Sequence, residues 1–480
     1  MLGRLVRELL LSMASTVLSR SLYIISAVVV ARWWGADEAG YFGLVQAVIV
    51  MLSAVPAQAA SMGAATHLSA VIRDGRRPAI RDLRMLLIFS LCVAVFPGIV
   101  FLVAPAWSSE NVVRFGGQGI LHAVGLTILF TVLAAVANGV LVALGRFREQ
   151  TIANALAALP GALVVAFGGA MAGSFGAAWA LCLAFLMQLI ALSHTALRML
   201  SSVVGSPSES GDLTTPDTSA GRNLWLVAVP VLLTGVMVAP TGWIASRILH
   251  EMGGGISQVG LYAAGSQILA VFSQLSVVLA VVLVPRLTRS SGLGEDQIDA
   301  VNMLAGWIAV LVCALPLLLW PEVIGRVFGG QYVSQRFNYV VQFLSIAAIL
   351  MAFKGGIGRK VVAKGYSWFS VVSNAGWLIG FVILASLMAP YGAAGVAFAF
   401  FVAHLGHFVV GLPFFARMGL MHWRYLVSPG AIGVWCSVIL VAGVGLSGHG
   451  LVVRTGALLL GIVSIAFGTR YLLRANKEVK

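Results

Sequence analysis

Arg20 stands near the middle of an otherwise apolar stretch that runs from about residue 9 to about residue 31. A charge at the centre of a membrane-spanning helix costs at least about 2.5–3.5 kcal/mol, so it usually faces a helix bundle or a wet cavity. On a helix, Thr16, Arg20 and Tyr23 share one face, and a guanidinium beside hydroxyl groups can bind a phosphate or diphosphate in bidentate fashion. We therefore predict an anion-binding site on this face. The alternative is that Arg20 bonds helix-end carbonyl groups within one bundle.

Other polar side chains in apolar stretches could line a hydrophilic cavity. Gln267 and Gln274 are seven residues apart, and Gln46 lies in a related earlier segment. Amides suit sugar hydroxyls, but they also join helices. Lys354 and Arg247 could contact an anionic substrate, although both lie near predicted span ends, where long basic side chains commonly reach the interface.

Prolines, histidines and acids add weaker signals. Pro230 and Pro240 fall in one predicted span, where each removes a backbone hydrogen bond, so we expect bending or gating as an alternative to simple packing. His404 and His407 are three residues apart without a third ligand, which favours a packed or hydrogen-bonded role over metal binding.

All 16 Asp and Glu residues fall in predicted loops, tails or span ends. No nucleophile with its base, Walker loop or metal spacing occurs, so we predict neither an enzyme nor a cofactor.

The composition excludes an ordinary soluble domain. Hydrophobic residues make up 60% of the chain and charged residues 10%, whereas soluble domains contain about 25% charged residues. The net charge of +14 could suggest nucleic acid, but the basic residues are dispersed among short loops between apolar segments. We therefore predict an all-α polytopic membrane protein that has membrane lipids, and no nucleic acid, as partners.

Hydropathy divides the chain into about fourteen membrane-spanning helices, because a helix satisfies its own backbone hydrogen bonds in lipid. We place them near residues 9–31, 41–68, 85–105, 120–144, 151–171, 175–197, 223–247, 259–284, 300–320, 337–358, 367–388, 393–416, 430–447 and 452–471. With the N-terminus in the cytoplasm, the great majority of the 30 Lys and Arg residues fall on the cytoplasmic side. The even number of spans then places the C-terminus there as well.

The chain contains an internal repeat. Residues 201–222 are rich in Ser, Thr and Pro and too polar to enter lipid, so we predict a cytoplasmic linker. The segments before and after it carry matching landmarks at an offset of 219–220 residues: Gly40 and Gly260, Gly145 and Gly365, Asn154 and Asn374, Gly176 and Gly395. An even number of spans separates the copies, so the repeats are parallel. We predict a six-helix N-lobe at 1–200, a six-helix C-lobe at 223–417, and two appended helices with a cytoplasmic tail at 418–480.

Residues 30–43 (VARWWGADEAGYFG) resemble the junction of the first two spans in bacterial polysaccharide exporters. These exporters belong to the multidrug/oligosaccharidyl-lipid/polysaccharide flippase superfamily. Residues 259–264 (VGLYAA), 284–287 (VPRL) and 324–332 (IGRVFGGQY) are similar to this family as well. The resemblance covers roughly residues 1–417. It implies two six-helix lobes, alternating access, and flipping of an undecaprenyl-diphosphate oligosaccharide across the bacterial inner membrane.

We therefore expect a flippase that feeds capsule, exopolysaccharide or O-antigen assembly, with polymerase and chain-length proteins as further partners. Arg20 would hold phosphate or an acidic sugar in a cavity between the lobes. Three alternatives stay open. A peptidoglycan-precursor flippase typically has more cavity arginines, and a multidrug exporter usually needs a carboxylate inside the membrane. A membrane polysaccharide polymerase or ligase generally has a large outer loop, which this sequence lacks.

Overall fold

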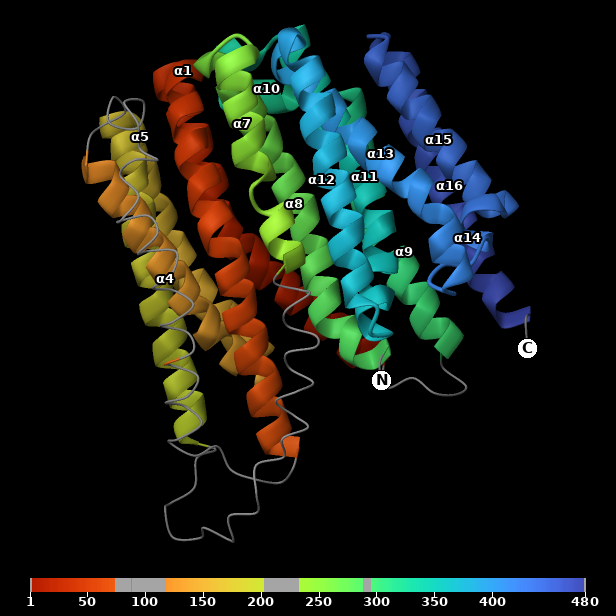
Figure 1. Ribbon diagram of the computed structural model, residues 1–480, viewed down its shortest axis with the longest axis horizontal. Coiled ribbons are helices and arrows are strands. Elements are labelled where there is room, and N and C mark those ends of the chain that lie inside the picture. The colour runs from red at the N-terminus through yellow and green to blue at the C-terminus, as the bar shows by residue number, and fades with distance from the viewer. Residues whose placement is uncertain (1, 74–87, 89–117, 203–232, 288–294, 479–480) are drawn as a thin grey trace, which may run out of the picture. The chain divides into compact units, whose positions relative to one another are not determined.

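The computed structural model describes residues 2–73, 88, 118–202, 233–287 and 295–478 (Figure 1). Over these ranges the chain forms helices, short 3₁₀ turns and loops, and no strand, which confirms the predicted all-α fold. The α-helices are α1 (Leu2–Arg73), α4 (Gln118–Ala143), α5 (Phe147–Ser201), α7 (Thr241–Met252), α8 (Ile256–Leu287), α9 (Glu295–Leu319), α10 (Glu322–Phe328), α11 (Gln335–Ala363), α12 (Ser367–Met388), α13 (Gly392–Arg417), α14 (Arg424–Val427), α15 (Pro429–Leu446) and α16 (Leu451–Glu478). The 3₁₀ turns are η2 (Gly330–Tyr332) and η3 (Ala389–Tyr391).

Nine helical stretches in the described part of the chain are long and apolar enough to cross a membrane. Three of these, Met13–Ala65, Phe147–Ser201 and Ser367–Arg417, contain 53, 55 and 51 residues, whereas about 20 residues suffice for one crossing. Each of the three breaks near its middle and so supplies two spans. The resulting spans match all of the predicted ones except the two near 85–105 and 223–247. These two lie wholly or partly outside the described residues. Most of the 201–222 linker lies outside them as well.

Glycines with positive φ form the breaks and turns, a conformation that glycine adopts at little cost. They recur at the offset of the predicted repeat: Gly35 (φ 87°) with Gly255 (86°), Gly145 (68°) with Gly365 (79°), and Gly173 (56°) with Gly392 (67°). The two halves therefore turn in the same way at corresponding positions, as a parallel repeat requires.

The described helices belong to two compact units. The first comprises Met1–Trp34 and Tyr41–Trp243, and the second comprises Gly35–Gly40 and Ile244–Lys480. In the first unit, α4 packs along α5, which folds back on itself so that Gly168 contacts the backbone of Gly176. In the second unit, α11 is central and packs against α8, α9 and α13. The appended helices α15 and α16 lie side by side and pack on α9 (Figure 1).

Candidate functional site

Arg20 is partly buried in the first arm of α1, where its guanidinium carbon lies 5.7 Å from the ring centre of Tyr23. Tyr23 is buried, its ring packs 5.1 Å from that of Phe185, and its hydroxyl is hydrogen-bonded to Thr131. Thr16 is partly exposed one turn before Arg20. Among the described residues, no carboxylate or other hydrogen-bond acceptor contacts the guanidinium. Within the described part of the chain, the contact recorded for this guanidinium is thus with the ring of Tyr23.

A buried polar network fixes the rotation of α1 next to Arg20. The Asn154 amide donates to Oγ of Ser15 (2.7 Å), and the Gln188 amide donates to Oδ1 of Asn154 (2.6 Å) and to Oγ of Ser19 (2.7 Å). Asn154 and Gln188 belong to the two arms of α5, so the network joins three spans. Because Ser19 precedes Arg20 directly, these bonds also set the direction in which the guanidinium projects.

Replacing Gln188 with leucine is expected to destabilise the protein by about 1–2 kcal/mol, because Oδ1 of Asn154 then stays buried without its donor. Thermal unfolding in detergent should show a lower Tm. The same replacement at the exposed Gln58 is the control and should leave Tm unchanged. Equal Tm values for both variants would show that the network contributes nothing to stability.

The remaining predicted amides lie in two different settings. Gln46 is buried and donates to the backbone oxygen of Tyr23 (3.0 Å) and to Oγ of Ser26 (3.0 Å). The turn at Gly35 brings residues 23 and 46 together, so Gln46 joins the two arms of α1, as the helix-joining interpretation expects. Gln267 and Gln274 are partly buried on one face of α8 in the second unit.

Lys354 lies at the centre of a polar cluster that the sequence did not reveal. Its ammonium nitrogen is 2.6 Å from Nδ1 of His407 and 3.3 Å from Nδ1 of His404. Nε2 of His407 is 2.5 Å from Oγ of Ser373. We call these four residues, from α11, α12 and α13, the Lys354 cluster. Sequence reasoning placed the lysine at a span end and treated the histidines separately; the only available signal was the spacing of the two histidines on one helix face.

Arg247 and the two prolines stand apart from these groups. Arg247 forms an ion pair with Glu251 one turn later in α7, and both side chains are exposed, as expected near an interface. Pro240 lies in a turn between a short helical segment at 233–238 and the start of α7, so the predicted seventh span is interrupted at this proline. Pro230 lies outside the described residues.

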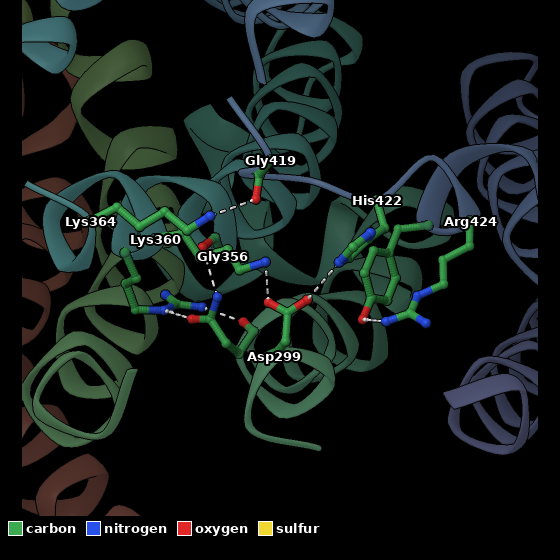
Figure 2. Close-up of polar contacts among 10 residues, drawn as sticks. Asp299, Gly356, Lys360, Lys364, Gly419, His422 and Arg424 are labelled. Atoms are coloured by element: carbon green, nitrogen blue, oxygen red, sulfur yellow. Dashed lines mark hydrogen bonds and ion pairs between the residues drawn. The ribbon is translucent and has the colours of Figure 1, made fainter. Parts of the chain in front are cut away.

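A second charged cluster joins the start of α9 to the end of α11 (Figure 2). Asp299, which is 5% exposed, pairs with Nζ of Lys360 at 2.5 Å and faces Nε2 of His422 at 3.9 Å. Next to it, Arg359 donates from Nε to Oδ1 of Asn302 (2.7 Å). Asp299 lies at the beginning of its span, which agrees with the predicted placement of acids at span ends, but its burial and partner are visible only in the structure.

Replacing Lys360 with methionine is expected to destabilise the protein by about 3–5 kcal/mol, because the carboxylate of Asp299 loses its partner in a buried place. The double variant Asp299→Leu, Lys360→Met should recover much of the loss in Tm. Lys364→Met is the matched control, since that ammonium bonds the Gly419 carbonyl (3.1 Å) at an exposed position. A single variant as stable as the control would contradict the prediction.

Three of the sequence segments that resemble the exporter family meet at the turn of α1. The amide of Ala36 donates to Oε1 of Gln331 (2.8 Å), and Gly260 packs against the carbonyl of Ala36. Beside them, burial and the carboxylate of Asp37 raise the pKa of Tyr332, so this phenol stays protonated. The resemblance therefore reflects one packed turn and not a catalytic centre.

The fold is similar to that of known transporters. An inward-facing multidrug resistance MATE family transporter of the MOP superfamily superposes with a TM-score of 0.61 at 13% identity, covering 85% of this chain and 98% of that one. A MOP superfamily transporter from Pyrococcus furiosus, whose binding pocket is described as having reverse polarity, gives a TM-score of 0.65 at 14% identity and coverages of 87% and 95%. The chain thus has the MOP-superfamily fold.

One relative by sequence is the EPS I polysaccharide export inner membrane protein EpsE of Ralstonia solanacearum. It is 22% identical over 406 residues, which cover 82% of this chain and 89% of the relative. EpsE of Ralstonia nicotianae is 23% identical over 183 residues, or 37% of this chain and 42% of that protein. No family model matches the chain. Together, the fold and these relatives confirm the resemblance to polysaccharide exporters of the superfamily.

Proposed function

We propose that this protein is a flippase that moves an undecaprenyl-diphosphate-linked oligosaccharide from the inner to the outer leaflet of the bacterial inner membrane by alternating access. The observation that carries the proposal is Arg20, a charge in an apolar span that no described residue neutralises. The transporter fold and the polysaccharide-export relatives support it. The glycan would then enter capsule, exopolysaccharide or O-antigen assembly, where polymerase and chain-length proteins act next.

Different side chains suit different chemical groups of such a lipid. The guanidinium of Arg20 binds the diphosphate through two parallel hydrogen bonds, with hydroxyl support from Thr16. In the second unit, the ammonium group of Lys354 offers another positive charge for phosphate or acidic sugar, and the amides of Gln267 and Gln274 suit sugar hydroxyls. The isoprenoid chain stays in the lipid, because its apolar surface is already shielded from water there.

The charges also bear on the alternatives. In the described part of the chain, acidic side chains lie at span ends and turns, whereas export of cationic drugs usually needs an acid deep in a span. An anionic cargo therefore fits better than a multidrug substrate, although the peptidoglycan precursor carries a diphosphate as well. A role as a polymerase or ligase is disfavoured because the sequence relatives are named for export. We accordingly propose a transporter that is not an enzyme.

Mass spectrometry of lipid-linked intermediates in a deletion strain tests this function. We expect an undecaprenyl-diphosphate oligosaccharide to accumulate and to resist a glycosidase added to spheroplasts, because it remains in the inner leaflet. Re-expression of the protein should expose it to the enzyme. Accumulation of the peptidoglycan precursor would identify the precursor flippase instead, and retention of drugs with normal lipid intermediates would identify the exporter.

A further inference from the structure

The Lys354 cluster brings three titratable bases together inside the second unit. His404 is 7% exposed and lies against two aromatic rings: Trp377 stacks on it at 4.6 Å with an interplanar angle of 28°, and Phe400 meets it edge-on at 4.7 Å. His407 reaches Oγ of Ser373, and both imidazoles face Lys354. The cluster is therefore partly enclosed and spans three helices.

No described acid balances this cluster. α13 presents the two histidines to Lys354 and α12 presents Ser373. On the other helices packed against α11, the acids whose side chains are described are Asp299 of α9, which pairs with Lys360, and Glu322 of α10, which pairs with Arg454. No contact with the cluster is recorded for the other titratable groups whose side chains are described on α11 and the helices packed against it: Tyr262 of α8, Cys313 of α9, Arg326 of α10, Arg336, Tyr339 and Arg359 of α11, Arg417 of α13 and Cys436 of α15.

The hydrogen-bond geometry accommodates one positive charge on the three bases together. When Lys354 is protonated, its ammonium group donates and Nδ1 of each imidazole accepts. Each neutral imidazole then carries its hydrogen on Nε2, and Nε2 of His407 donates to Oγ of Ser373. Moving a proton from Lys354 to His407 leaves the total charge unchanged. Releasing one proton makes the cluster neutral, and this removes the cost of an uncompensated charge in an apolar surrounding.

The first repeat shows that helix joining at these positions does not need ionisable groups. The offset of 219–220 residues relates His407 to Gln188 and Lys354 to Ala134. In the first unit, Gln188 joins spans through neutral amide and hydroxyl groups, and Ala134 is buried. The second repeat holds a lysine and an imidazole at the same places, where apolar or neutral side chains would pack at lower cost. This asymmetry calls for a function of the bases themselves.

We propose that the Lys354 cluster is a proton-binding site, which gains and releases one proton as the transporter moves through its cycle. The coupling part of this inference rests on the proposed function, because it supposes an anionic cargo. A nearby anion favours the protonated cluster, and by reciprocity the protonated cluster favours the anion. The pH of the medium must then influence export through these three bases.

Because Trp377 stacks on His404 and a protonated imidazole quenches indole emission, the fluorescence of Trp377 reports the protonation of His404. The purified full-length protein is titrated in detergent from about pH 5 to about pH 8 while tryptophan emission is followed. We expect a quenching step that is lost in His404→Gln and in Trp377→Phe and that changes in Lys354→Gln. His122→Gln, at an exposed histidine of α4, should retain the wild-type curve. Identical curves for wild type, Lys354→Gln and His404→Gln would overturn the proposal.

The coupling is tested in the deletion strain by re-expressing His404→Gln or His407→Gln, in which the glutamine still offers Lys354 an acceptor. We expect export of the lipid-linked glycan to lose its dependence on medium pH, with unchanged protein levels in the membrane. Export with the wild-type pH dependence would overturn the coupling. Absence of any accumulated glycan lipid in the deletion strain would instead refute the proposed cargo, while the fluorescence titration still decides whether the site binds a proton.

Discussion

Replacing Arg20 with methionine is expected to abolish glycan export and to accumulate the same lipid-linked intermediate as deletion of the protein. Each hydrogen bond to a charged group contributes about 1.5–3 kcal/mol, so loss of a bidentate contact to the diphosphate weakens binding at least about a hundredfold. Folding should not suffer, because no described residue depends on this guanidinium for an ion pair or hydrogen bond. The measurement is mass spectrometry of the intermediate, combined with the amount of protein in the membrane.

Arg20→Lys separates charge from geometry. Lysine keeps the positive charge but presents a point charge instead of a planar fork, so we expect partial export. Arg32→Met removes an exposed arginine from the same helix and should export as the wild type does. Normal export by Arg20→Met would refute the anion-binding role of this residue and leave the proposed function resting on the fold and the relatives alone.

Leucine at Gly40 or at Gly260 is expected to prevent folding. A Cβ atom on Gly40 would lie 2.1 Å from the carbonyl oxygen of Ile256, and one on Gly260 would lie 2.1 Å from that of Ala36. Residues 36 and 256, like residues 40 and 260, are related by the repeat, so the two contacts are reciprocal. A backbone carbonyl within a helix cannot move aside as a side chain can, and we expect each substitution to cost more than about 3 kcal/mol.

Size-exclusion chromatography of fluorescent fusions in detergent checks this prediction, with loss of the monodisperse peak as the expected result. Gly376→Leu and Gly406→Leu introduce the same side chain where nothing lies within 4 Å of the new Cβ, and both should give the wild-type profile. A normal profile for the Gly40 or Gly260 variant would show that the two backbones do not need this close approach.

The amino-acid sequence by itself determined the helical class, the order of the spans and the repeat. In lipid, each crossing must satisfy its own backbone hydrogen bonds, so every span becomes an apolar run of predictable length. Glycines mark the turns because positive φ strains other residues, so the sequence alone marks Gly145 and Gly365 as corresponding turns. Arg20 was visible for the same reason, since a charge stands out in an apolar run.

Only the tertiary structure decided which polar side chains meet. Lys354 and His407 are 53 residues apart, and Asp299 pairs with Lys360 from another helix. Gln46 could have lined a cavity, but it joins the two arms of α1. The physical reason is that a span is apolar on both its lipid-facing and its protein-facing sides, so hydropathy does not reveal how each helix is rotated. That rotation, set by packing, selects the partners of every buried polar group.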